Sequence, residues 1–155
     1  AYLDGANFDR ANLDEANLVR ANLDRVYLVG ASLAGANLAG AYLARASLNR
    51  ANLAGANLVG AKITINEVGE ASLIGARPIM QIGPVGSRAA TMLAAITDKG
   101  LAIRLCTEGF DPIDSIRQQV DDTYGDEPHG VEYRAALDMA QKHAELWTPD
   151  REGAL

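Results

Sequence analysis

Every fifth residue in the first half of the chain is large and apolar, and this spacing limits the possible folds more than any other feature. These residues are Leu3, Phe8, Leu13, Leu18, Leu23, Leu28, Leu33, Leu38, Leu43, Leu48, Leu53, Leu58, Ile63, Val68 and Leu73. A period of five matches neither the helical repeat of about 3.6 residues nor the strand repeat of 2, so no single helix or strand buries them together. The chain must therefore turn after every five residues.

A square coil meets this requirement. Each side points its central apolar residue and a preceding residue, nearly always Ala, toward the inside, and four sides close one turn. Residues twenty apart then stack at roughly 4.8 Å, and each turn is buried against its neighbours. We therefore predict a β solenoid, a right-handed quadrilateral β-helix, over residues 1–76. The alternative, a disordered Ala/Asn/Gly segment, does not explain an apolar residue at every fifth position.

The repeat unit resembles that of the pentapeptide-repeat family, whose pattern is A(D/N)LXX. The sequence Ala-Asn-Leu-Asp-Glu stands at residues 11–15 and Ala-Asn-Leu-Ala-Gly at residues 51–55. The resemblance implies the same β-helical fold. The chain begins on a repeat position without Met, so we expect further residues to precede Ala1.

Stacking of residues twenty apart allows the outer faces to be read from the sequence. Two faces carry charged and aromatic residues, such as Tyr2, Tyr27 and Arg25. The other two become smooth and nearly uncharged after the first turn, beside a column of Asn17, Asn37 and Asn57 that can hydrogen-bond along the stack. A flat apolar strip is a candidate protein-contact surface; the alternative is that Ala and Gly are simply tolerated on a tight coil. The predicted contact residues are Val19, Ala34, Ala39, Ala54, Val59 and Ile74.

Residues 77–155 are predicted to form a small α+β domain. Pro78 falls on the next repeat position and removes a backbone donor, so the solenoid should end there. A strand is expected from Ile79, followed by a β-hairpin that turns at residues 98–100. A helix should then start with Asp111 as its N-cap and stop at Gly125, and a second should cover about residues 130–146.

This C-terminal region resembles the β-hairpin and two-helix tail that follows pentapeptide repeats in some bacterial and bacteriophage proteins. The resemblance covers roughly residues 79–146 and rests on Ile-Gly-Pro-Val-Gly-Ser-Arg at 82–88, Thr-Asp-Lys-Gly at 97–100 and the segment 124–136. It implies a module without supplying an activity.

Residues that could support catalysis lack a supporting motif. Cys106 with His129 could form a thiol nucleophile and its base, but a Cys in an apolar strand is usually a core residue. His143 has no second ligand at metal spacing. The acidic residues at 121, 122, 126 and 127 lack the alternation of an EF-hand loop, and Ser87 and Arg88 lack a complete phosphate-binding motif. We therefore predict no enzyme activity, no cofactor and no metal.

Charge and cysteine content restrict the partners and the compartment. A net charge of −6 argues against direct binding of nucleic acid, which requires a basic surface. No apolar run reaches 18 residues, so no membrane association is expected. The single cysteine excludes an internal disulfide and is compatible with the cytoplasm.

The sequence therefore predicts a non-catalytic module for protein binding or assembly, as a homo-oligomer or with another protein. The contact is expected at an end of the coil, where bare backbone groups need a cap, or at the two smooth faces. A bacteriophage virion or decoration component is one such role. The alternative is a DNA-mimic inhibitor or protector of DNA gyrase, an activity known for some pentapeptide-repeat proteins. Residues 1–76 carry a net charge of only −1, which weakens that alternative.

Overall fold

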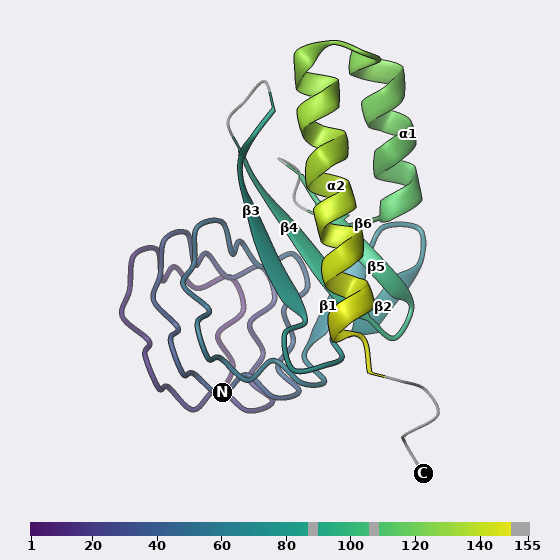
Figure 1. Ribbon diagram of the computed structural model, residues 1–155. Coiled ribbons are helices and arrows are strands. Elements are labelled where there is room, and N and C mark those ends of the chain that lie inside the picture. The colour runs from purple at the N-terminus through teal and green to yellow at the C-terminus, as the bar shows by residue number, and fades with distance from the viewer. Residues whose placement is uncertain (87–89, 106–108, 150–155) are drawn as a thin grey trace.

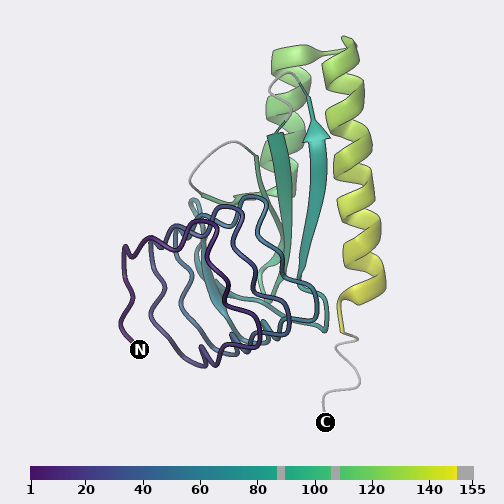
Figure 2. The same ribbon diagram turned by 90° about the vertical axis from the view of Figure 1, so that its left-hand side faces the viewer.

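The computed structural model describes residues 1–86, 90–105 and 109–149, which form three layers. A coil built from the N-terminal repeats lies against one face of a four-stranded sheet, and two helices cover the other face (Figure 1). A view turned by 90° shows the coil as a stack of successive loops (Figure 2).

Residues twenty apart pair in the coil, as the repeat predicts. Parallel bridges join Tyr2 to Asn22 and Asn22 to Tyr42, and the same spacing continues along the other sides of the coil. The Leu23 amide, for example, donates to the Tyr42 carbonyl at 2.8 Å. One turn therefore takes twenty residues, or four repeats, and the segment has a β-helix-like fold.

The central apolar residues fill the inside of the coil. Leu23, Leu28, Leu33 and Leu38 are all at most 1% exposed. Their counterparts in the first turn, such as Phe8, are only half-buried because a neighbouring turn covers them on one side alone. The second turn, which has a neighbour on both sides, is therefore the most buried part of the coil.

The regular repeats give way to a hairpin after Ala61, short of the predicted boundary at residue 76. Strands β1 (Lys62–Ile65) and β2 (Gly69–Ser72) form an antiparallel hairpin instead. The β-branched residues in β1 favour an extended strand, and Glu67 and Gly69 take the positive φ angles, 63° and 98°, that reverse the chain. Leu73 returns to the coil, where its amide donates to the Ala61 carbonyl at 2.8 Å.

The sheet contains four antiparallel strands in the order β3-β4-β5-β6. Their bounds are β3, Ile79–Val85; β4, Ala90–Thr97; β5, Gly100–Arg104; and β6, Asp111–Pro112. The predicted strand at Ile79 and the hairpin with its turn at 98–100 are confirmed. Side chains alternate along β4: Leu93 and Ala95 join the core of the coil, whereas Met92 and Ala94 join the core under the helices.

Helices α1 (Ile113–Tyr124) and α2 (Pro128–Trp147) pack on the sheet through one apolar stripe each. The prediction that Asp111 caps α1 is wrong, because Asp111 pairs in β6 and the capping position belongs to Pro112. Gly125 ends α1 as predicted and its amide donates to the Asp121 carbonyl at 3.0 Å. Within the described residues, neither helix is both long and apolar enough to cross a membrane.

Two side chains from the sheet close the last turn of the coil. The buried Arg104 guanidinium donates to the Ala46 carbonyl, and Gln81 Nε2 donates to the Ala51 carbonyl at 2.6 Å. In the preceding turns the corresponding carbonyls accept backbone amides, as Ala31 does from Asn52. The C-terminal region therefore caps this end of the coil.

Candidate protein-contact surface

Two neighbouring sides of the coil are free of charge over its second and third turns. Residues 31–40 and 51–60 contain no charged residue, and their outer positions form what we call the uncharged face. Its centre is a column of asparagines, in which Asn57 Nδ2 donates to Asn37 Oδ1 at 3.2 Å. The predicted hydrogen bonding along the column is thus present between Asn37 and Asn57.

The corners beside the asparagine column are small, which keeps the face flat. Gly35 and Gly55 lie on one corner and Gly40 and Gly60 on the other, all with φ between 65° and 70°. A side chain rarely adopts this left-handed region, so Gly is the natural residue there. Each asparagine also fixes its own corner, since Asn37 Oδ1 accepts the Ala39 amide and Asn57 Oδ1 accepts the Val59 amide, both at 3.2 Å.

Five of the six predicted contact residues lie along these two corners. Val19 and Val59 are exposed, at 41% and 54%, and stand in one column with the half-buried Ala39. Ala34 is half-buried and Ala54 is exposed in the other column.

Ile74 is separated from the other five. Its amide donates to the Ile96 carbonyl at 3.1 Å, and its side chain lines a groove with Ala144 of α2. The hairpin at residues 62–72 replaces the fourth turn, so Ile74 does not stack above Ala54 on an open face.

A groove of about 510 Å³ lies where the uncharged face meets the sheet. Leu53, Ala54 and Ala56 form its coil side, and Ile79 and Met80 form the opposite side.

Two polar residues belong to the same groove. Arg77 lies with its Cζ 4.6 Å from the centre of the Trp147 ring, and His143 Nε2 lies 2.9 Å from the Arg77 carbonyl oxygen. The groove combines an apolar wall with polar groups. Local sequence patterns do not reveal it, because its sides are up to 90 residues apart in the chain.

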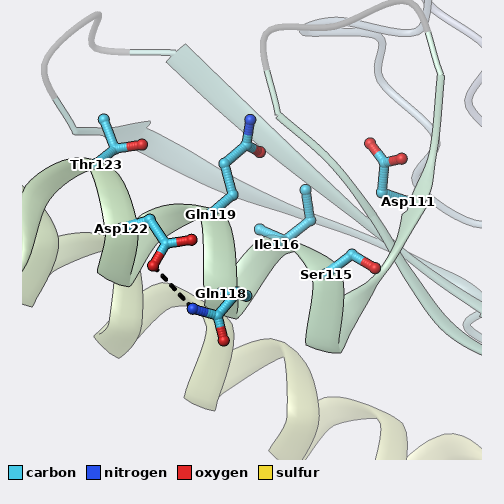
Figure 3. Close-up of a pocket in the computed structure, with 7 residues that line it drawn as sticks. All are labelled: Asp111, Ser115, Ile116, Gln118, Gln119, Asp122 and Thr123. Carbon is cyan, nitrogen blue, oxygen red and sulfur yellow. Dashed lines mark hydrogen bonds between the residues drawn. The ribbon is translucent and has the colours of Figure 1, made fainter.

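A second groove runs along α1 and is polar (Figure 3). Gln118 Nε2 donates to Asp122 Oδ1 at 2.8 Å, and Asp111 Oδ1 accepts from Asn66 Nδ2 at 3.0 Å. These side chains bond to one another or to a neighbouring segment, and the arrangement brings no nucleophile and base together among the residues that line it.

The residues considered for catalysis have ordinary surroundings. His129 Nδ1 lies 4.0 Å from a Glu132 carboxylate oxygen, and both side chains are about half exposed. Asp121 and Asp126 pair with Arg134 at 3.1 and 3.4 Å, so one arginine engages two of the four acidic residues. Across residues 1–86, 90–105 and 109–149, no three His, Cys, Asp or Glu side chains are placed to hold a metal. Cys106, Ser87 and Arg88 lie outside the described residues.

The coil and its flat face define a β-helix-like repeat protein. The pentapeptide-repeat family matches residues 1–30 and 27–64 with eight repeat copies, so this segment of the chain belongs to that family. No curated protein sequence matches the chain.

Two solved structures of pentapeptide-repeat proteins are similar to parts of the chain. HetL, from the cyanobacterium Nostoc sp. strain PCC 7120 and involved in heterocyst differentiation regulation, is 40% identical over 39% of this chain and 31% of its own, with a TM-score of 0.35. The chain thus spans about a third of HetL. The protein alr5209 from Nostoc PCC 7120 is 31% identical over 44% of this chain and 69% of its own, with a TM-score of 0.23.

Proposed function

We propose that this chain is a non-catalytic module that holds a protein partner, or a second copy of itself, on the uncharged face. In this proposal the repeats form a right-handed quadrilateral β-helix that serves as a rigid support. The C-terminal region closes one end of the coil and supplies the far wall of the groove.

The observation that supports the proposal most is the continuity of the uncharged face with the groove. Ala54 belongs to both, so a partner that covers the face can place an apolar side chain between Leu53 and Met80. Protein interfaces exclude charges from their centre, and the uncharged residues 31–40 and 51–60 meet that condition. Exposed apolar side chains such as Val59 gain free energy when a partner removes them from water.

The gyrase alternative requires a row of available carboxylates that copies the charge of duplex DNA. In the coil, Asp9, Asp14 and Asp24 each accept the backbone amide of a residue twenty positions later, at 2.8 to 3.0 Å. Asp4 lies 3.6 Å from Arg25. These contacts favour a structural role for the carboxylates. The gyrase role and the virion role stay predictions from the sequence.

A pair of charged substitutions tests the proposal. Ala39→Arg with Ala54→Arg places two charges on the uncharged face, and we expect capture of a protein partner from extracts of the native host to be lost. The matched control, Gln119→Arg with Thr123→Arg, adds the same charge on exposed positions of α1. Equal binding by the wild type and both variants would contradict the proposal.

A further inference from the structure

Arginine occupies five corners of the coil where the backbone favours glycine. Six corners with positive φ hold Gly, whereas the corners at Arg10, Arg20, Arg25, Arg45 and Arg50 have φ between 53° and 59°. This left-handed region is unfavourable for residues with a side chain, and Asn or Asp tolerates it better than Arg does. The backbone therefore does not explain these arginines, which points to a role for their side chains.

Three of the five arginines cluster with two exposed tyrosines. Arg25 and Arg45 share one corner in successive turns, where the Arg25 amide donates to the Ala44 carbonyl at 2.7 Å. Arg50 occupies the next corner of the same turn as Arg45. Tyr42 precedes the Arg45 corner and Tyr27 follows the Arg25 corner, with 43% and 53% of their surfaces exposed. We call these five residues the arginine–tyrosine surface.

Few carboxylates are available to neutralise this surface. Residues 41–50 contain two arginines and no acidic residue. Asp4 is 3.6 Å from Arg25, but within the described part of the chain Arg45 and Arg50 take part in no ion pair. The nearby Lys62 is already engaged: its hydrogen bond with Glu70, at 2.7 Å, and the Glu70 charge raise the pKa of Lys62.

Guanidinium groups at exposed corners bind carboxylates through two parallel hydrogen bonds, and tyrosine adds a hydroxyl donor and an aromatic ring. The surface thus fits a carboxylate-rich protein segment. The chain contains such a segment where α1 leads into α2: Asp121 and Asp122 in the last turn of α1, and Asp126 and Glu127 after it, are exposed around a single Arg134. We call these four acidic residues the acidic connection.

The charges of the two regions are also unequal. Residues 77–155 contain thirteen acidic and eight basic residues, a net charge of −5, against −1 for residues 1–76. The α1–α2 connection lies at the end of the helices remote from the coil in both views (Figures 1 and 2). One chain therefore cannot bring its own acidic connection to its own arginine–tyrosine surface.

We propose that the acidic connection of a second copy docks on the arginine–tyrosine surface. The contact joins two different patches, so it is heterologous: one copy of a dimer keeps a free arginine–tyrosine surface and the other keeps a free acidic connection for further association. This contact uses none of the residues of the uncharged face and does not rest on the function proposed above.

Sedimentation velocity of the full chain tests the contact. It is measured in about 0.02 M and in about 0.5 M NaCl, because salt screens the attraction between exposed charges. The wild type should associate with increasing concentration in low salt and dissociate in high salt. The triple variant Arg25→Gly, Arg45→Gly, Arg50→Gly should associate at least about tenfold more weakly. Its melting temperature should be unchanged or higher, because Gly suits these corners.

A second variant tests the other patch without touching the coil. Asp122→Asn, Asp126→Asn, Glu127→Gln should weaken association as strongly, and an equimolar mixture of the two triple variants should form a dimer that neither forms alone. Arg10→Gly with Arg20→Gly is the control for corner substitution, and Ala39→Arg with Ala54→Arg is the control for the uncharged face; both should still associate.

Three results would overturn the proposal. One is a wild type that stays monomeric at every concentration in low salt. Another is association that survives in either triple variant. The third is a monomer that instead binds a DNA duplex through the three arginines, which would assign the surface to nucleic acid.

Discussion

The coil and the C-terminal region reach similar burial by different routes. In the coil, one five-residue pattern is repeated, and each residue meets the residue twenty positions away, as Asn37 meets Asn57. In the C-terminal region the contacts follow no repeat: in β4, for instance, Leu93 packs toward the coil and Met92 packs toward the helices. From a periodic sequence, the packing of the repeated units can therefore be predicted. From a non-periodic sequence, mainly the helices and strands can be predicted, and their packing cannot.

The largest expected effect is in the coil. Leu38 is 1% exposed, so Leu38→Asp places an unpaired charge inside the stack and should lower the free energy of unfolding by several kcal/mol, on the order of 4 or more. Circular dichroism and thermal melting would measure the loss. Leu38→Met is the control and should cost less than about 1.5 kcal/mol. An unchanged melting curve for the Asp variant would break the account of the coil.

A cavity under the helices should have a smaller effect. Leu137 on α2 is fully buried, and Leu137→Ala should lower the free energy of unfolding by about 2–5 kcal/mol. Chemical denaturation followed by circular dichroism at the helix signal would measure it. Met139 on the same helix is 54% exposed, so Met139→Ala should change stability by less than about 0.5 kcal/mol. Equal costs for the two variants would contradict the packing of α2 on the sheet.

The smallest effect is expected at the junction between the two regions. Gln81→Met keeps most of the side-chain volume but removes the bond to the Ala51 carbonyl, at an expected cost of about 1–3 kcal/mol for an acceptor left without its donor. The free energy of unfolding from urea titration tests this value. Gln119→Met on the exposed side of α1 is the control. A gain in stability for the Gln81 variant would show that the junction does not depend on this bond.

The sequence predicts the coil well because the stacking rule needs only one spacing. The pairing of residues twenty apart follows from it, and so does the placement of five of the six predicted contact residues along neighbouring corners. The rule failed at residues 62–72, where Ile63 and Val68 keep the five-residue spacing but the chain folds back as a hairpin. Here the β-branched residues of β1 and the turn at Glu67 and Gly69 outweigh the period.

In the C-terminal region, turn signals located the elements but not their neighbours. Gly100 and Gly125 marked a hairpin and a helix end correctly. The groove beside Ala54 and the cap of the coil by Arg104 were not predictable, since both depend on how the sheet docks against the coil. Local propensity carries no information on that docking.

Site-specific photocrosslinking tests the central claim, that the uncharged face is where this protein meets a protein. A photoreactive benzoylphenylalanine is placed at Ala39 and, in a separate chain, at the exposed Gln119 of α1, and both are irradiated in extracts of the native host and as purified protein. We expect a discrete crosslinked product from position 39, with a protein partner or a second copy, and none from position 119. No product from position 39, or the same product from both positions, would contradict the claim.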